Sequence, residues 1–378
     1  MLGSTGSIGQ QTLNIVRKDP TLKVAAIAAR ASWKEVLAQA KEFSASAIAL
    51  EDPEAARSAE REKSAFGLDN LVVFSGPEGI ARCAELDEAN VVVHAVPGFA
   101  GILPLIRALE KGKRVAFAGK EALVSAGELI EPYIRKNPGQ LVPVDSEHSA
   151  LFQCLLGEDP DSVAELVLTA SGGALRDYSL EEMRRVTPGE VLAHPTWKMG
   201  KKITVDSATL VNKSLEVIEA HYLFGVPYEK LKVVIHRQSI VHSMVTFVDG
   251  STKAQASVPN MSLAISYGIT YPERRPGVVR SLAPYVGTLT FEEPDAERFP
   301  GVLLGHMAGK MGGTAPCAFS CADEILVGEF LAGRIGFTDI TRILLGFLES
   351  YRPKPVDGLD ILREEAARTE RKIRELLP

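Results

Sequence analysis

The sequence predicts an α/β protein with three parts: an N-terminal doubly wound domain, a central α+β domain and a C-terminal helical bundle. Short apolar strands alternate with amphipathic helices up to residue 143, which indicates a mostly parallel sheet. Apolar strand patterns without this alternation follow, up to residue 259. Four helical segments then close the chain, a pattern typical of a bundle.

The composition excludes several classes of protein. The 378 residues are 46% hydrophobic and 24% charged, as in ordinary globular chains. A net charge of −6 provides no basic field for nucleic acid. Apolar runs stay shorter than the roughly 18 residues of a transmembrane helix, so we expect no membrane contact. The four scattered cysteines lack zinc-site spacing and are expected to be reduced thiols of a cytoplasmic protein.

The first βαβ unit contains a glycine turn. Glycines at 3, 6 and 9 precede a predicted helix, 10–18, and a predicted strand, 24–29. Such glycines let backbone amides approach a pyrophosphate at a helix N-terminus, so we expect a Rossmann-like dinucleotide site. The alternative is a tight turn that binds nothing. Only Met1 and Leu2 remain for the strand before the turn, as expected if the chain starts at an internal methionine or has been shortened.

Arg30 follows the second predicted strand. NAD sites commonly have an acid at this place for the ribose 2′-hydroxyl, whereas an arginine suits a 2′-phosphate. Arg30 therefore favours NADP, and the alternative is an ordinary surface arginine.

The alternation continues through the N-terminal domain. The predicted strands are 47–50, 71–74, 91–95 and 114–118, and the predicted helices are 33–43, 53–64, 77–86 and 102–111. Lys120 follows the last of these strands, at the edge where open α/β sheets bind ligands. We interpret Lys120 as a candidate for a substrate phosphate or hydroxyl, and the alternative is a solvated lysine.

A third strand end contains two acids. The apolar segment 140–144 leads into Asp145, Ser146 and Glu147. If the strand continues past Asp145, both carboxylates point to one face. A hard divalent cation would offset their repulsion. The alternative is a strand end with solvated acids.

The central domain starts with a strand, 167–170, that runs into Ser171 and two glycines. This turn is rich in amide donors and is a candidate anion site or an ordinary loop. Residues 194–202 combine His194, Trp197 and three lysines around Gly200, a composition that suits a lid over a charged ligand. The alternative is a structural loop packed by Trp197.

Within the segment 203–221, Ser207 or Thr209 is expected to cap a largely buried helix that carries the residues after it. Asn212 and Glu216 would share one face, with Lys213 beside them. A buried Glu216 needs a cation partner. Either Lys213 is that partner, or Glu216 binds a metal shared with the two acids after residue 144.

The remaining segments complete the domain plan. We expect strands 232–236, 243–248 and 254–259 in an antiparallel sheet, a linker rich in proline and charge, and C-terminal helices 302–311, 315–330, 337–348 and 359–376. The predicted boundaries are 1–143 for the NADPH-binding domain, 144–272 for the catalytic domain, 273–305 for the linker and 306–378 for the helical domain.

These motifs together resemble the 1-deoxy-D-xylulose 5-phosphate reductoisomerase family. The matching pieces are GSTGSIG (3–9), GKEALVSAG (119–127), PVDSEHSA (143–150), TASGG (169–173), HPTWKMGKKITVDSATLVNKSLEVIEAH (194–221), QSIVHSMV (238–245) and EPDAERFP (293–300). The resemblance implies a homodimer that uses NADPH and a divalent cation (Mg²⁺, Mn²⁺ or Co²⁺). It implies conversion of 1-deoxy-D-xylulose 5-phosphate, a small sugar phosphate, into 2-C-methyl-D-erythritol 4-phosphate for isoprenoid biosynthesis.

The resemblance also assigns site residues. It implies the metal ligands Asp145, Glu147 and Glu216, which with Lys120 form the catalytic set. The implied substrate residues are Lys120, Ser146, Glu147, Ser171, His194, Ser207, Asn212, Lys213 and Glu216, with His242 in the same region. The implied cofactor residues are Thr5, Gly6, Ser7, Ile8, Glu121 and Gly200, to which Arg30 is added, and the lid residues are Trp197 and Met199.

Several positions depart from the family pattern. Gly119 stands where an asparagine is usual, so one cofactor hydrogen bond is expected to be missing. The stretch from Arg30 to Ser32, Arg237 in place of a proline, and 319–324 in place of an asparagine-rich segment also differ. Two further hypotheses are therefore kept: a related NADP-dependent oxidoreductase with a shifted sugar-phosphate substrate, and a non-catalytic binding protein, which the intact acids disfavour.

Overall fold

The computed structural model describes residues 1–197, 199–282 and 287–377. The chain forms two compact units, each made of several segments. The first consists of Met1–Ala122, Pro132–Ser149 and Asn260–Arg280, and the second of Leu123–Glu131, Ala150–Pro259 and Ser281–Pro378.

The first unit contains two parallel three-stranded ladders, ordered β1-β2-β3 and β4-β5-β6. Leu2 lies between them, because it forms isolated parallel bridges with both Ala28 and His94. The predicted mostly parallel arrangement is therefore confirmed. The strands are β1 (Ala26–Ala29), β2 (Ala47–Leu50), β3 (Val72–Ser75), β4 (Val91–His94), β5 (Arg114–Phe117) and β6 (Leu141–Pro143).

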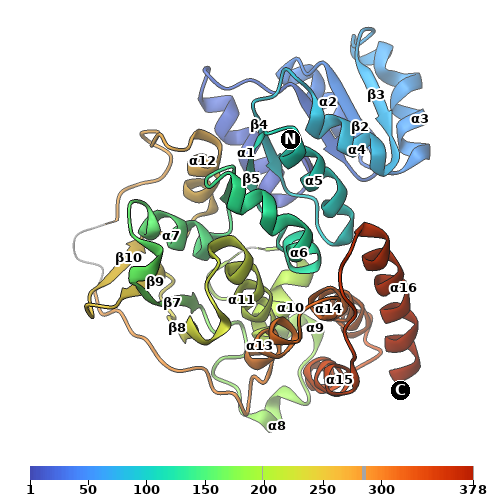
Figure 1. The fold of residues 1–378 in the computed structure, drawn as a ribbon. Helices are drawn as coiled ribbons and strands as arrows, with labels where there is room; N and C mark the ends of the chain where they lie inside the picture. The colour runs from blue at the N-terminus through green and yellow to red at the C-terminus, as the bar shows by residue number, and fades with distance from the viewer. Residues whose placement is uncertain (198, 283–286, 378) are drawn as a thin grey trace. The chain divides into compact units, whose positions relative to one another are not determined.

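Helices cover these strands with their apolar stripes. α2 buries Val36 and Leu37 in a core that also contains Ile27 and Ile48. In Figure 1, β2 and β3 lie side by side with α3 next to them. The helices of this part are α1 (Ser7–Lys18), α2 (Trp33–Phe43), α3 (Pro53–Glu62), α4 (Gly76–Glu85) and α5 (Ile102–Glu110), with short 3₁₀ turns at Lys63–Phe66 and Phe99–Gly101.

Neither α6 nor α12 was predicted from the sequence. α6 (Lys120–Lys136) contains Pro132 and is kinked at Ala126, which obscures its periodicity. α12 (Met261–Thr270) is apolar on most faces because it is buried. Its Ile265 and Ile269 pack against Ala116 and Val144 in the first unit.

The second unit contains a four-stranded sheet of order β10-β9-β7-β8. The prediction of an antiparallel sheet is wrong in one respect: β7 pairs in parallel with β8, and antiparallel only with β9. The segment between β7 and β8 contains several helices, and a connection of that length can return a strand in the parallel direction. The strands are β7 (Val163–Ala170), β8 (Leu231–Ile235), β9 (Val241–Phe247) and β10 (Thr252–Ala256).

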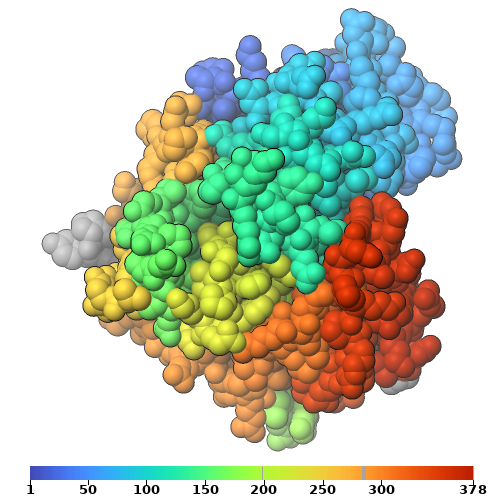
Figure 2. Space-filling model, in the orientation of Figure 1, coloured from blue at the N-terminus to red at the C-terminus, as the bar shows by residue number. Residues whose placement is uncertain are grey.

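Helices make up the rest of this unit. The C-terminal helices contact one another as predicted, and Figure 2 shows α16, in red, against the orange-red helices before it. The helices are α7 (Ser146–Leu155), α8 (Leu180–Met183), α9 (Pro188–Val191), α10 (Lys201–Thr209), α11 (Val211–Phe224), α13 (Gly301–Met311), α14 (Ala315–Leu331), α15 (Phe337–Ser350) and α16 (Leu359–Leu376), with 3₁₀ turns at Pro160–Ser162 and Tyr228–Lys230; the first residues of α7 belong to the first unit.

Among the described residues, the helices are too short or too polar to span a bilayer. A cavity of about 1200 Å³ opens near the start of β1 and β4, lined by Ala25, Ala26 and Val91 among others. Open α/β sheets bind ligands at the opposite, carboxyl ends of their strands. The cavity therefore does not lie at the edge where such sheets bind ligands.

Candidate active site

The glycine turn has the geometry of an anion-binding helix start. Gly3 has φ of +84°, and a Cβ there would collide with the carbonyl of Ala95. α1 begins at Ser7, and its N-cap Gly6 has no side-chain cap. The first N–H groups of the helix are thus available to a ligand oxygen.

The other predicted cofactor residues in the first unit lie at strand ends too. Thr5 and Ile8 are half-buried within this turn, and Arg30 is exposed just after β1. Glu121 lies in the first turn of α6, which follows β5. The carboxyl ends of the strands therefore present a basic side chain, a glycine turn and a helix start.

Lys120 forms a buried ion pair with Asp145. β5 and β6 are adjacent and parallel, with Phe117 opposite Pro143, so the residues after both strands meet at one edge. Lys120 Nζ lies 2.6 Å from Asp145 Oδ2, and Lys120 is 6% exposed. Lys120 is therefore buried and paired, and the alternative of a solvated lysine is wrong.

The predicted strand continuation at Asp145 is wrong. β6 ends at Pro143 and α7 begins at Ser146, so Asp145 and Glu147 flank a helix start and do not alternate along a strand. The backbone N–H of Ser149 donates to Asp145 O at 2.8 Å, and Ser146 Oγ donates to the Glu147 carboxylate. Negative groups are favourable at this end of a helix.

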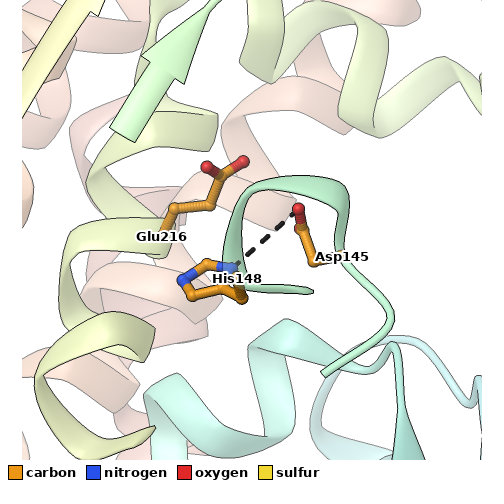
Figure 3. Close-up of side chains that lie close together, drawn as sticks. All are labelled: Asp145, His148 and Glu216. Carbon is orange, nitrogen blue, oxygen red and sulfur yellow. Dashed lines mark ion pairs between the residues drawn. The ribbon is translucent and has the colours of Figure 1, made fainter. Parts of the chain in front are cut away.

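His148 was missed by the sequence reasoning. Its Nδ1 lies 3.9 Å from Asp145 Oδ1. Figure 3 shows this pair, together with Glu216 of the second unit. The imidazole is fully buried. The signal was its spacing of three residues from Asp145 at a helix start.

Glu216 is buried on α11 beside two polar neighbours, as predicted. Lys213 Nζ lies 2.6 Å from Glu216 Oε2, and Asn212 Nδ2 donates to Oε1. Glu216 and Lys213 are 1% and 4% exposed. Lys213 is thus a cation partner of Glu216, and whether Glu216 also binds a metal stays a prediction.

The predicted helix that follows Ser207 or Thr209 is present as α11, and Leu210 separates it from α10, which was not predicted. Leu210 has φ of +60°, in the left-handed region. Ser207 lies inside α10, while the hydroxyl of Thr209 accepts the N–H of Val211 at 3.2 Å. The hydroxyl of Thr209 therefore accepts the backbone N–H of the first residue of α11.

Ser171 and His194 form a hydrogen-bonded pair that joins the end of β7 to the predicted lid. His194 Nδ1 accepts the N–H groups of Thr196 and Trp197 at 3.1 and 2.9 Å. Burial lowers the pKa of His194, and Arg176 adds to the effect. The neutral ring therefore carries its proton on Nε2, which donates to Ser171 Oγ at 3.0 Å.

The predicted lid, 194–202, is irregular in its described residues from His194 to Gly200, whereas Lys201 and Lys202 begin α10. The ring of Trp197 lies 6.4 Å from that of His242, and Met199 is half-buried. Lys198 lies outside the described residues. Gly200 is exposed at the N-cap of α10.

Two departures from the family pattern have structural counterparts. Arg237 pairs with Asp177 at 2.6 Å and with Glu292 at 3.1 Å. Asp323, in the altered 319–324 segment, is fully buried and lies 2.6 Å from Lys202 Nζ. Arg237 and Asp323 are thus each paired with a side chain of opposite charge in the second unit.

Comparisons with known proteins identify the family. A model described as 1-deoxy-D-xylulose 5-phosphate reductoisomerase matches residues 1–127, and two models of its C-terminal domains match 141–224 and 256–375. The enzyme of that name from Heliobacterium modesticaldum is 46% identical, with 97% of this chain and 94% of the relative covered. That from Chlorobaculum tepidum is 48% identical, with 90% and 89% covered.

Solved structures give the same result. The reductoisomerase from Zymomonas mobilis in complex with NADPH has a TM-score of 0.91 and 37% identity, covering 99% of this chain and 97% of its own. A DOX-P reductoisomerase in complex with NADPH, fosmidomycin and magnesium has a TM-score of 0.92 and 35% identity, covering 99% and 96%. The resemblance drawn from the motifs is confirmed: the chain belongs to the 1-deoxy-D-xylulose 5-phosphate reductoisomerase family.

Proposed function

We propose that this chain is an NADPH-dependent reductoisomerase that converts 1-deoxy-D-xylulose 5-phosphate into 2-C-methyl-D-erythritol 4-phosphate with a divalent cation. The observation that carries the proposal is the buried pair of Lys120 and Asp145 at the carboxyl ends of β5 and β6. The glycine turn of the same unit is hydrogen-bonded to the end of β1: the backbone N–H of Gly3 donates to the carbonyl oxygen of Ala28. A charged reaction centre and a dinucleotide turn thus share one sheet edge.

The metal site of the proposal consists of Asp145, Glu147 and Glu216. All three offer carboxylate oxygens, which Mg²⁺ and Mn²⁺ prefer. When bound, the cation polarises the substrate carbonyl and stabilises a developing alkoxide. A cation would also offset the desolvation of Glu216, which lies buried on α11.

The chain's own residues would orient the reactants. Thr5, Gly6, Ser7 and Ile8 would hold the pyrophosphate side of NADPH, Arg30 the 2′-phosphate, and Glu121 and Gly200 its remaining polar groups. On the substrate side, Ser171 accepts from His194 Nε2 and can donate its own hydroxyl proton to a phosphate oxygen.

The remaining substrate residues of the proposal are polar side chains of the second unit or of the α7 start. Asn212 and Lys213 precede Glu216 by about one turn, and Ser207 is half-buried on α10. Trp197 and Met199 would close over the substrate and exclude water. The set comprises Ser146, Ser171, His194, Ser207, Asn212 and Lys213.

We also propose the domain limits predicted from the sequence, a homodimer and a cytoplasmic location. The free thiols of Cys83, Cys154, Cys317 and Cys321 suit a reducing compartment. Sedimentation of the purified chain would test the homodimer, since a monomer at enzyme concentrations would contradict it.

The function is tested by NADPH oxidation with 1-deoxy-D-xylulose 5-phosphate, with and without Mn²⁺. We expect turnover that needs both the substrate and the metal. Metal-independent oxidation of NADPH with another sugar phosphate would favour the related oxidoreductase. NADPH binding without any turnover would favour the binding protein.

A further inference from the structure

His94 occupies a buried position beside the N-terminus of α6. It is the last residue of β4, and its side chain is fully buried. Its Nε2 lies 2.8 Å from the carbonyl oxygen of Gly101. Burial lowers the pKa of His94 to about 4, so the ring is neutral at neutral pH. A carbonyl only accepts, so Nε2 carries the proton and Nδ1 holds the lone pair.

The imidazole fills the space that a side chain at position 119 would need. A Cβ on Gly119 would lie 2.6 Å from His94 Cε1 and 2.7 Å from His94 Nδ1. The backbone of Gly119 has φ of −91°, which a residue with a side chain can adopt. The two shortest contacts are thus with the imidazole, the carbonyl oxygen of Val96 follows at 3.0 Å, and backbone strain plays no part in excluding a larger residue there.

The same ring also contacts the loop after β4. A Cβ on Gly101 would lie 2.8 Å from the carbonyl oxygen of Val96, 2.9 Å from His94 Cε1 and 3.2 Å from His94 Nε2. The imidazole is thus packed between two glycines, one at the start of α5 and one at the start of α6. It fixes the spacing of two loops at the cofactor edge of the sheet.

This arrangement accounts for the departure at Gly119. The resemblance leads us to expect an asparagine at this position, but that side chain and the His94 ring cannot occupy the same volume. α6 begins directly after Gly119 with Lys120 and Glu121. Any shift of this helix start would move Lys120 relative to Asp145, which lies 2.6 Å away.

We propose that His94 is a positioning residue that replaces a side chain at position 119 and holds the start of α6 for NADPH binding. The proposal rests on the proposed function, since it concerns the cofactor of that reaction. It makes the two positions interdependent: a larger residue at 119 requires a smaller one at 94. The ring acts through Gly101 and Gly119 and need not touch the cofactor itself.

A double-mutant cycle tests the interdependence. The variants are G119N, H94A and H94A/G119N, and the measurement is the Kd of NADPH by its fluorescence on binding, without substrate. We expect G119N to weaken NADPH binding at least about tenfold, a change of about 1.4 kcal/mol. The double variant should recover to within about threefold of the parent, because residues in contact are energetically coupled and the loss of the ring leaves room for the new side chain.

Controls separate positioning from a general loss of folding. Gly346 lies in α15 with open space around its Cα, so G346N introduces the same side chain without a clash and should bind NADPH like the parent. The KM of NADPH should rise in G119N more than kcat falls. If G119N does not fold, a double variant that folds and binds NADPH still supports the proposal, and one that also fails overturns it.

Additive effects in the cycle, or a G119N variant with the parent's Kd, would overturn the proposal. The Kd values of the cycle are measured without substrate and do not depend on turnover. If the parent chain bound NADPH but did not convert 1-deoxy-D-xylulose 5-phosphate, the proposed function would fail while the coupling between positions 94 and 119 could still be measured.

Discussion

Replacing Glu216 by glutamine separates the proposed metal role of this carboxylate from its structural role. The side chain is 1% exposed and receives Lys213 Nζ at 2.6 Å and the amide of Asn212. Glutamine keeps the shape but loses the charge. A hydrogen bond to a charged group contributes about 1.5–3 kcal/mol, so the unfolding free energy should fall by roughly 2 kcal/mol.

The effect on catalysis should be larger than the effect on stability. A Lewis acid contributes several kcal/mol to transition-state stabilisation. Loss of about 4 kcal/mol corresponds to a fall in kcat/KM of roughly a thousandfold. NADPH binding should be unchanged, because the proposed cofactor residues do not include Glu216.

The assay is NADPH oxidation with the substrate over a titration of Mn²⁺, alongside the Kd of NADPH and a thermal melt. E219Q is the matched control, since Glu219 is equally buried on the same helix and is not a proposed ligand. We expect E219Q to lose stability but to keep its response to Mn²⁺. An E216Q protein that loses NADPH affinity as strongly as turnover, or that keeps the parent's Mn²⁺ response, would refute the metal assignment.

Three further predictions concern other charged groups. K202M should lower the unfolding free energy by about 3 kcal/mol, because it removes an ammonium from the buried carboxylates of Asp206 and Asp323, 2.7 and 2.6 Å away; a urea melt identical to the parent's would contradict it. R30A should raise the KM of NADPH far more than that of NADH, and equal increases would mean that Arg30 does not read the 2′-phosphate. His94 has its ordinary pKa of 6.5 in the unfolded chain and a pKa of about 4 in the folded chain. Below pH 6.5 the unfolded chain therefore binds a proton that the folded chain does not. The unfolding free energy should be constant above pH 6.5 and should fall by roughly 3 kcal/mol as the pH drops from 6.5 to 4. Urea melts across that range should show this loss, and H94N should flatten it.

Local sequence patterns were sufficient for much of the fold. The limits of α2 and β2 agree with the prediction, because a strand buried on every face and an amphipathic helix each have a signature within about ten residues. Asn212 and Glu216 were predicted as neighbours because helical spacing alone places them there. The glycine turn before α1 was also readable, since its positive-φ geometry at Gly3 requires glycine.

Patterns of this kind could not predict features that depend on distant partners. α12 has no polar face to reveal its period, and only its burial against Ala116 and Val144 explains its composition. The parallel pairing of β7 with β8 depends on the helices between them. The helix start at Ser146 was mistaken for a strand, because two acids after an apolar segment suit either one.

The sequence by itself determined the residue types of the proposed site: carboxylates, a lysine at a strand end, a glycine turn and a histidine next to the predicted lid. Only the tertiary structure decided which of those groups meet. The ion pair of Lys120 with Asp145 exists because β5 and β6 are neighbours in the sheet. The exclusion of a side chain at Gly119 exists because the ring of His94 fills that volume. The physical reason is that the chemistry of a residue is local, whereas its distance from a partner depends on how the whole chain packs.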